Sequence, residues 1–420
     1  MVTRAKRILL IGYNFSPEPT GIGRYSGEMI DWFVQEGYDC SVITAYPYYP
    51  YWEVQEPYVK RRFKFTKERT DHPSGGSVTT YRCPMYVPEN PSGIKRILVD
   101  VSFFITAFLQ LSLLLFRKKF QLIITVAPCF QLGLLGVYYK KLRGGKLVYH
   151  IQDLQIEAAQ DLGMIRSPSI IKSLLKVEKY IFNKTDVISS ISEGMVSKIK
   201  QKAEKEVYFF PNWTNTAFFY PFSESEIHKI KNNYGFETHD KIILYSGAIG
   251  EKQGLEMILS TAKTVQSNPD IKFIICGTGP YRLRLQEMTI RENITNVYFF
   301  PLQPLEKFNA FLNIADVHLV IQKAKAGDLV MPSKLTNILS VGGLALITAN
   351  IGTGLYNVVT NHQMGIVVEP ENPIAFRDGL LNAIQKKNQQ LKGNALHYAQ
   401  NFLAINTIMK RFERTQLDQL

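Results

Sequence analysis

The 420-residue sequence has few cysteines, and they lie far apart. They occupy positions 40, 83, 129 and 276, with no close pair among them. Disulfide frameworks and structural zinc sites both need cysteines at short, recurring spacings. We therefore expect neither, and a reducing cytoplasm fits this composition best.

The N-terminal segment lacks the features of a secretory signal. MVTRAKRILLIGYNF starts with basic residues, but its apolar run is short and no small-residue cleavage site follows. This run is typical of a first β-strand. Low-complexity segments and short-period repeats are also lacking. With 45% hydrophobic and 20% charged residues, the composition is that of a globular protein, long enough for two domains.

Acidic residues are missing from part of the chain. Residues 101–150 contain seven basic residues and no acidic one, and the net charge is +13. The first 210 residues hold 29 Lys or Arg and 19 Asp or Glu, against 20 and 17 in the remainder. A basic N-terminal half indicates an anionic partner; the alternative is a merely soluble basic surface. Because no helix-turn-helix, zinc-finger or RNP-like motif is present, we expect no nucleic-acid partner.

Short β-rich runs alternate with helical segments in two series. This alternation predicts an α/β protein of two Rossmann-like domains with parallel sheets facing across a cleft. We place an N-terminal domain at 1–210, a C-terminal domain at 211–395, and a final helix at 396–420 that crosses back to the N-terminal domain. The predicted strands are 7–15, 40–46, 121–127, 146–152 and 186–192, then 241–247, 271–277, 296–300, 316–322, 344–349 and 365–370.

One apolar segment does not fit a simple strand–helix scheme. ILVDVSFFITAFLQLSLLLF, at 97–116, has five polar members, and Ser102, Thr106 and Gln110 recur at helical spacing. Such a helix is buried, spans a bilayer, or lies in its interface. Asp100 and the polar stripe disfavour spanning. We predict a domain helix with an exposed membrane-docking face, with pure core as the alternative, and anionic headgroups meeting the cationic groups at 117–119 and 140–143.

The first motif that could bind a ligand is a glycine loop, PTGIGRYSGEM at 19–29. It lies between the first strand and helix, where backbone amides can meet phosphate. Gly21 and Gly23 are in the part of the loop that would approach a ligand. The loop is too long for a dinucleotide fingerprint, and the second strand carries no carboxylate for a ribose. A sugar diphosphate fits better than NAD, the alternative being an ordinary flexible loop.

Three further turns join strands to helices in the C-terminal half. In SGAIGEKQGLEM (246–257), Gly247 begins the turn, and Lys252 can meet diphosphate charge as a leaving group departs, unless it is a solvated turn lysine. CGTGPYRLRL (276–285) offers Gly277 and Gly279 for close approach of a nucleoside and Arg282 for phosphate.

The fourth motif is AGDLVMPSKLTNILSVGG, at 326–343. Ser333 lies at or near a helix start, and Lys334 falls in the first turn, where the helix dipole disfavours a cation. A bound anion between the lysine and the amides would explain this placement. Asn337 follows one turn later on the same face.

Taken in order, SPEPTGIGRYSGEM, HIQDLQIEAAQDLG, FFPNWTN, YSGAIGEKQGLE and GDLVMPSKLTNILSVGG resemble bacterial family-4 glycosyltransferases of the GT-B fold. Within that family the chain is most similar to the colanic-acid group of fucosyltransferases, and the resemblance covers nearly all of it. It implies an acceptor-binding N-terminal domain and a donor-binding C-terminal domain. It also implies that Gly21 and Gly23 face the donor diphosphate and that Lys252 and Lys334 neutralise the leaving nucleoside diphosphate. Retention of configuration without a metal is implied too, and no Asp-x-Asp motif is present.

The sequence departs from the family at one position. The wider family has two glutamates eight residues apart, the second where Asn337 stands and the first at Leu329. Asn337 can still hydrogen-bond a ribose hydroxyl as donor and acceptor. We take Asp328 as the substitute for the first glutamate, so the identity of the donor sugar stays open.

His150 and Asp153 end a strand at the edge where parallel sheets bind ligands. A paired histidine and carboxylate can position or deprotonate an acceptor hydroxyl. The alternative is a packed histidine and a helix-capping aspartate. Glu157 and Asp161 are interpreted as solvated helix residues.

These observations predict a retaining, metal-independent hexosyltransferase, with fucosyl as the specific group, that uses no cofactor. Its donor would be a GDP- or UDP-linked sugar and its acceptor a saccharide on a polyprenyl-diphosphate lipid. We expect it in the cytoplasm, peripherally bound to the anionic inner membrane. A nucleotide-sugar epimerase of the same architecture and a non-catalytic membrane-associated scaffold are the alternatives.

Overall fold

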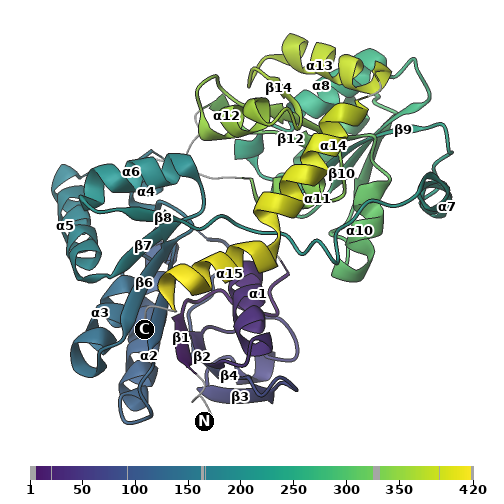
Figure 1. The fold of residues 1–420 in the computed structure, drawn as a ribbon. Coiled ribbons are helices and arrows are strands. Elements are labelled where there is room, and N and C mark those ends of the chain that lie inside the picture. The colour runs from purple at the N-terminus through teal and green to yellow at the C-terminus, as the bar shows by residue number, and fades with distance from the viewer. Residues whose placement is uncertain are drawn as a thin grey trace. The chain divides into compact units, whose positions relative to one another are not determined.

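The computed structural model describes residues 6–19, 21–91, 93–161, 165, 167–324, 332–386 and 388–417 (Figure 1). The chain divides into two compact units. Unit 1 comprises Met1–Pro211 and Met409–Leu420, and unit 2 comprises Asn212–Ile408. Each unit is built around its own sheet, so each is described separately.

Unit 1 contains an eight-stranded sheet in the order β3-β4-β2-β1-β5-β6-β7-β8. All neighbouring strands are parallel except β3 and β4, which pair antiparallel at one edge. Strands β1, β5 and β6 are almost fully buried, as their continuous apolar sequences require in a sheet covered on both faces. The strands are β1 Arg7–Ile11, β2 Asp39–Thr44, β3 Thr66–Asp71, β4 Ser77–Arg82, β5 Leu122–Ala127, β6 Lys146–Ile151, β7 Val187–Ser190 and β8 Val207–Phe209.

The helices of unit 1 connect these strands and cover the sheet. Helices α2, α3 and α5 pack side by side (Figure 1). The end of α15 also belongs to this unit, where Phe412 stacks on Phe210 with 4.6 Å between ring centroids. The helices are α1 Gly21–Gln35, α2 Gly93–Leu114, α3 Leu132–Arg143, α4 Gln155–Asp161, α5 Pro168–Lys184, α6 Glu193–Ala203 and α15 Ile405–Gln416, with a short 3₁₀ helix at Val59–Arg61.

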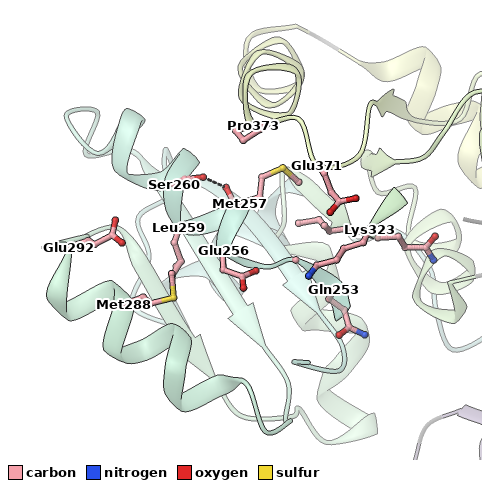
Figure 2. Close-up of a pocket in the computed structure, with 13 residues that line it drawn as sticks. Gln253, Glu256, Met257, Leu259, Ser260, Met288, Glu292, Lys323, Glu371 and Pro373 are labelled. Carbon is pink, nitrogen blue, oxygen red and sulfur yellow. Dashed lines mark hydrogen bonds between the residues drawn. The ribbon is translucent and has the colours of Figure 1, made fainter. Parts of the chain in front are cut away.

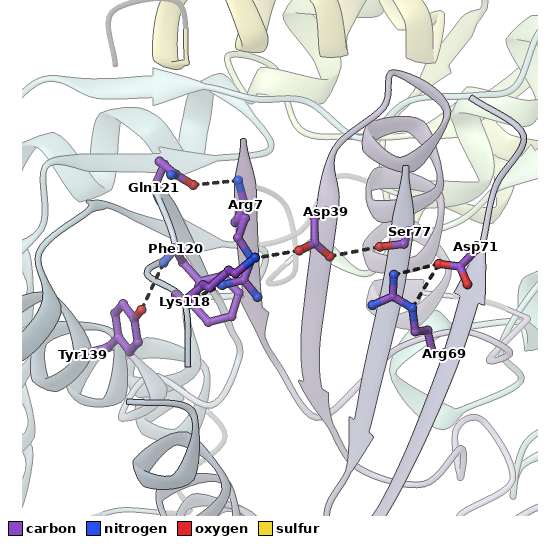
Figure 3. A network of polar contacts seen from close by, with 9 residues as sticks. All are labelled: Arg7, Asp39, Arg69, Asp71, Ser77, Lys118, Phe120, Gln121 and Tyr139. Atoms are coloured by element: carbon purple, nitrogen blue, oxygen red, sulfur yellow. Dashed lines mark hydrogen bonds and ion pairs between the residues drawn. The ribbon is translucent and has the colours of Figure 1, made fainter. Parts of the chain in front are cut away.

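A polar network holds the strand starts of unit 1 together (Figure 3). The Arg7 guanidinium donates to Asp39 at 2.8 Å, and the Ser77 hydroxyl donates to the same carboxylate at 3.0 Å. The Arg7 backbone N–H donates to the Gln121 side chain at 2.6 Å. These bonds join β1, β2, β4 and β5 at their N-terminal ends. This network occupies the N-terminal ends of the strands, whereas ligands of such sheets bind at the C-terminal ends.

Helix α2 has two different apolar faces. Val99, Phe103, Ala107 and Leu111 are buried in the core of unit 1. The opposite face is exposed and equally apolar, with Ile94, Ile97, Leu98, Val101, Ile105, Phe108, Leu109 and Leu113. Among the described residues α2 is the one helix long and apolar enough to cross a membrane. Its buried face belongs to the core of unit 1, and its exposed apolar face favours the predicted domain helix with an exposed face over the pure-core alternative.

Unit 2 contains a six-stranded, fully parallel sheet in the order β11-β10-β9-β12-β13-β14. Its core centres on Ile243, Phe273, Leu319 and Leu346 from the middle strands. The strands are β9 Lys241–Ser246, β10 Ile271–Cys276, β11 Val297–Phe300, β12 Val317–Val320, β13 Ala345–Thr348 and β14 Ile366–Val368. The helices are α7 Glu224–Asn233, α8 Glu256–Val265, α9 Arg282–Arg291, α10 Leu305–Asn313, α11 Ser333–Ser340, α12 Gly354–Asn361, α13 Pro373–Gln385 and α14 Gln389–Tyr398, with a 3₁₀ turn at Glu251–Gln253 and a π-helical turn at Ala399–Leu403.

Candidate functional site

Three predicted donor glycines lie where β9 and β10 end in unit 2. The Gly247 N–H donates to Cys276 O at 3.0 Å, and the Ile249 N–H donates to Thr278 O at 2.9 Å. A Cβ on Gly277 would fall within 3.0 Å of the Gly247 backbone, and one on Gly279 within 3.0 Å of Ile249. Both glycines also have positive φ, at 144° and 155°. The two turns therefore approach each other so closely that only glycine fits at positions 277 and 279.

Lys334 extends from the first turn of α11 to the same place. Its Nζ lies 3.7 Å from the centroid of the Tyr245 ring, which favours a cation. It also lies 2.9 Å from the position that a Cβ on Gly247 would take. Burial lowers the pKa of this lysine to about 7. Unit 2 thus holds a poorly solvated amino group beside the half-buried Gly247 turn, an arrangement suited to an anionic ligand.

Arg282 stabilises the turn that it was predicted to use for binding. Its guanidinium donates to Gly277 O at 2.7 Å and to Phe300 O at 2.8 Å. These bonds tie the start of α9 to the ends of β10 and β11. In the structure Arg282 acts on the shape of the glycine turn, while a contact with phosphate stays a prediction.

Ser333 and Asn337 occupy different environments on α11. Ser333 is exposed and is the first residue of the helix, with Pro332 in the cap position before it. Asn337 is buried, and its Oδ1 accepts a hydrogen bond of 3.3 Å from the Thr214 hydroxyl. The helix start is therefore close to the predicted one, and Asn337 is held by a neighbour within unit 2.

Two of the predicted residues cannot be placed. Asp328 lies outside the described residues. Lys252 belongs to the 3₁₀ turn at Glu251–Gln253, and its side chain lies outside the description. Their roles stay predictions.

A cavity of about 300 Å³ lies beside the turn between β9 and α8 (Figure 2). Gly254, Gln253 and Glu256 line it from the turn and α8, and Lys323 and Glu371 line it from the ends of β12 and β14. Lys323 was not predicted from the sequence, because nothing around it resembles a binding motif. It lies 3.4 Å from the position of a Cβ on Gly254, so it belongs to the surroundings of that turn.

One group of possible metal ligands exists among the described residues. His239, Asp240 and Asp270 lie within ligand distance of one another. They come just before β9 and β10, at the strand ends opposite the glycine turns. Asp240 already accepts a hydrogen bond of 2.8 Å from the Glu237 N–H. The group therefore lies at the opposite end of the strands from the donor motifs.

In unit 1 the first glycine loop packs on a buried glutamate that the sequence did not single out. Gly21 begins α1 with a φ of 62°, and a Cβ on Gly23 would fall within 3.0 Å of the Glu18 side chain. The Glu18 carboxylate accepts hydrogen bonds from Asn14 at 2.8 Å and from the Tyr48 and Tyr49 N–H groups at 3.2 and 3.1 Å. It joins the loops after β1 and β2 and fixes the start of α1.

Burial of Glu18 has a consequence for stability. Desolvation raises its pKa to about 7, although the three hydrogen bonds act in the opposite direction. The folded state therefore holds this proton more tightly than the unfolded chain, whose glutamate titrates near 4.5. The stabilising effect is complete below pH 4.5 and is lost as the pH rises through 7.

We predict that the unfolding free energy of wild type falls by about 3 kcal/mol more than that of Glu18→Gln between pH 4.5 and 8. Urea unfolding of both proteins across this range measures the difference. Glu53→Gln, at an exposed position of the following loop, is the matched control and should leave the decline unchanged. Parallel pH profiles for wild type and Glu18→Gln would contradict the prediction.

His150 is buried within unit 1. Its Nδ1 lies 3.0 Å from the Ser189 hydroxyl, its ring meets Phe210 edge-on at 5.2 Å, and only 1% of it is exposed. Burial lowers its pKa to about 3, too low for a base that works near neutral pH. Of the two interpretations of His150, the structure favours the packed histidine, and deprotonation of an acceptor by this ring is not supported.

Asp153 remains at the ligand edge of unit 1. It is partly exposed and lies two residues before α4. Burial is the main cause that raises the pKa of Tyr13, just after β1, and the charge of Asp153 adds to it. The interpretation of Glu157 as a solvated residue is wrong, because it forms an ion pair with Lys202. The Asp161 side chain lies outside the described residues.

Comparison with known proteins places the chain among enzymes that transfer sugars. Residues 226–398 match the family model described as glycosyl transferases group 1. The chain is 38% identical over 412 residues to a protein of Escherichia coli K12 that is assigned to colanic acid biosynthesis as the glycosyl transferase WcaI. That match covers 97% of this chain and 98% of the relative.

Solved structures show the same fold at low sequence identity. Sucrose-phosphate synthase of Thermosynechococcus elongatus superposes with a TM-score of 0.75 at 15% identity, covering 99% of both chains. HepE of Anabaena, in complex with UDP and glucose, has a TM-score of 0.68 at 14% identity and covers 99% of this chain and 100% of its own. The two parallel-sheet units are those of the GT-B fold, as predicted from the sequence.

Proposed function

Because the chain belongs to the group 1 glycosyltransferases, we propose that it moves a hexosyl group, specifically fucosyl, from a nucleoside-diphosphate sugar to a lipid-linked oligosaccharide in colanic-acid-type exopolysaccharide synthesis. The family assignment favours a transferase over the epimerase and scaffold alternatives. The proposal rests on one observation above all: Gly247, Gly277 and Lys334 come together at the C-terminal edge of the unit 2 sheet. HepE, a protein of the same fold, has been solved in complex with UDP and glucose.

The lysine and glycine turns gathered at this edge suit the departure of a nucleoside diphosphate. As the bond between the sugar's anomeric carbon and the phosphate oxygen breaks, negative charge develops on that oxygen. The Lys334 ammonium and the turn backbone would stabilise the charge in a poorly solvated place. In the retaining reaction that we propose, the acceptor oxygen bonds to the same face of the anomeric carbon. Its proton then passes to the departing phosphate oxygen.

This reaction needs no basic side chain from unit 1, which agrees with the burial of His150. Asp153, partly exposed at the C-terminal edge of the unit 1 sheet, would orient the acceptor hydroxyl. Gly21 and Gly23, at the start of α1, would let backbone approach the donor diphosphate. Glu18 would keep that helix start in place.

Identification of the donor is the direct test of this proposal. Purified protein is incubated with labelled GDP- and UDP-linked sugars, and release of the nucleoside diphosphate is followed with and without lipid extract. We expect release from one of these donors, with GDP-fucose as the specific expectation, and only when acceptor lipid is present. Rearrangement of the sugar while it stays attached to its nucleotide would instead identify an epimerase.

We expect transfer to be independent of divalent metal ions. The sequence has no Asp-x-Asp pair, and lysine can provide the positive charge that a cation gives other transferases. Transfer rates are measured before and after treatment with EDTA, and we predict that they agree within about twofold. Loss of activity in EDTA, with recovery on adding Mg²⁺ or Mn²⁺, would contradict this prediction.

The exposed face of α2 supports peripheral binding to an anionic membrane. Its apolar side chains can enter the headgroup–acyl boundary while the buried face stays in the core. Arg117, Lys118 and Lys119 follow the helix and are exposed. Of the second cationic group, Lys140 is paired with Asp186 and Arg143 donates to the Arg117 carbonyl, so these two are less free to meet headgroups.

We predict that Arg117→Gln, Lys118→Gln and Lys119→Gln together lower binding to anionic vesicles about 100-fold at low salt. Each such cation contributes about 1 kcal/mol near an anionic surface. Binding by wild type should weaken at high salt without vanishing, because screening does not act on inserted apolar area. Co-sedimentation measures binding, and transfer to a short soluble acceptor should stay near wild type. Wild-type protein that stays in the supernatant at low salt would end the peripheral model.

A further inference from the structure

A short basic and aromatic stretch of unit 1 is neither core nor part of the sites described above. It has the sequence Lys-Arg-Arg-Phe-Lys-Phe at 60–65, here called the 60–65 segment. All six residues are exposed, including 78% of Phe63 and 48% of Phe65. Among the described residues its four cations form no ion pair. A solvated basic loop would account for the cations, but not for two phenylalanine rings in water.

The segment is held in position by its neighbours. The Tyr46 hydroxyl donates to Lys64 O at 2.8 Å and lies 3.0 Å from the Thr66 hydroxyl. The Lys64 N–H donates to Arg61 O at 2.8 Å. The Arg62 guanidinium lies 4.9 Å from the centroid of the Phe63 ring. The rings are therefore presented by a defined turn, and little conformational freedom would be lost on binding.

Strand topology places this segment at the ligand edge of unit 1. It leads into β3, whose first residue Thr66 pairs with Arg82 at the C-terminal end of β4. Arg82 is buried and donates to Ser16 O at 3.0 Å and to the Tyr58 hydroxyl at 3.3 Å. The same arginine thus braces both the loop that contains Glu18 and the turn that leads to the segment.

We propose that the 60–65 segment is a second membrane contact, separate from α2, that docks on an anionic bilayer. Phe63 and Phe65 enter the headgroup–acyl boundary while the surrounding cations meet anionic headgroups. This contact would bring the ligand edge of unit 1 to the membrane surface, where a lipid-linked acceptor presents its saccharide. The inference rests on the peripheral membrane binding proposed above, but on different residues.

The two parts of the segment should contribute in different ways. Four cations near an anionic surface each contribute about fivefold in affinity, so their removal should lower vesicle binding by a factor on the order of 10² to 10³ at low salt. The phenylalanines are insensitive to screening. Replacing them with alanine should therefore remove most of this segment's contribution that persists at high salt.

The test uses the full chain and vesicles with about 30% anionic lipid, with neutral vesicles for comparison. Two variants of the segment are compared with wild type. In one, the four cations are replaced at once by Lys60→Gln, Arg61→Gln, Arg62→Gln and Lys64→Gln. In the other, both rings are replaced by Phe63→Ala and Phe65→Ala. A matched control removes four exposed cations of unit 2 by changing Lys229, Arg284, Arg291 and Lys307 to Gln. A Phe63→Trp protein, read against wild type, reports insertion through a blue shift and through quenching by brominated lipid. Thermal unfolding checks that each variant is folded.

We expect weaker vesicle binding for both segment variants and wild-type binding for the control. The extra emission of the Phe63→Trp protein should shift to the blue with anionic vesicles and be quenched when these contain brominated lipid, and neutral vesicles should do neither. Binding equal to wild type in the segment variants, or extra emission unchanged by vesicles, would overturn the inference while leaving α2 docking and sugar transfer intact. Binding of a soluble anionic saccharide in place of vesicles would also overturn it. If wild type itself does not bind anionic vesicles, the proposed peripheral binding to the membrane fails as well.

Discussion

Lys334→Ala should lower the turnover number of sugar transfer by about 10²–10³, the scale for losing one preorganised group that stabilises developing charge. The Lys334 amino group is the cation that the structure places against the Gly247 turn, over the Tyr245 ring. Without it, charge on the departing diphosphate would develop in a poorly solvated place with one fewer cation to stabilise it. Lys252→Ala, which changes the other predicted lysine, should have an effect of the same order.

Steady-state transfer rates at saturating donor measure this loss. Lys307→Ala, at an exposed lysine of α10, is the matched control and should keep wild-type turnover. Folding of each variant is checked by thermal unfolding. A folded Lys334→Ala protein that retains more than half of wild-type turnover would remove Lys334 from the site.

The depressed pKa of Lys334 adds a second readout. Burial holds this pKa at about 7, so at pH 8 much of the free protein has a neutral amine at this position. A bound diphosphate favours the charged form and raises the pKa. Binding of a nucleoside diphosphate at pH 8 should therefore take up a proton. Calorimetry in two buffers of different ionisation enthalpy detects this uptake, which Lys334→Ala should lack.

Gly277→Ala should cost far more than a methyl added at a glycine with free space around it. The new Cβ would fall within 3.0 Å of the Gly247 carbonyl, which is backbone and cannot rotate away, and the φ of 144° already disfavours a side chain. The two turns would have to separate. We expect unfolding free energy to fall by about 2–4 kcal/mol and donor turnover to fall at least about 10²-fold.

Gly235→Ala separates backbone strain from the clash. Gly235 also has a positive φ, at 79°, but nothing lies within 4 Å of the position that a Cβ would take there. This control should lose only about 1 kcal/mol of stability and keep its activity. Urea unfolding and donor turnover of both variants provide the comparison. Equal effects at the two glycines would show that the close approach of the turns is unimportant for the site.

The parallel strands could be predicted from the sequence because they are continuous apolar runs. β5, predicted at 121–127, spans Leu122–Ala127, and β10, predicted at 271–277, spans Ile271–Cys276. Burial on both faces leaves little ambiguity in such segments. The antiparallel pair β3 and β4 was not predicted, because TKERTD at Thr66–Asp71 is polar and exposed. An edge strand of this kind lacks the apolar signal and depends on its partner.

The candidate site divides in the same way. Glycines at strand ends could be predicted because a glycine-rich turn after a strand is itself a signal of closely approaching backbone, although the backbone that Gly277 approaches, at Gly247, is known only from the structure. Glu18 could not, since its importance depends on Tyr48 and Tyr49, about thirty residues away. Burial of His150 likewise depends on Ser189 and Phe210, which reach it only in the folded sheet.

The central claim is that this chain transfers sugar to a lipid-linked oligosaccharide with its unit 2 turns and Lys334. The most direct measurement is radiolabel transferred from GDP-fucose to extracted inner-membrane lipids by purified protein in EDTA. The account predicts label in the lipid fraction, lost in Lys334→Ala and retained in Lys307→Ala. Label that stays with the nucleotide under every condition, or that reaches lipid equally well in Lys334→Ala, would contradict it.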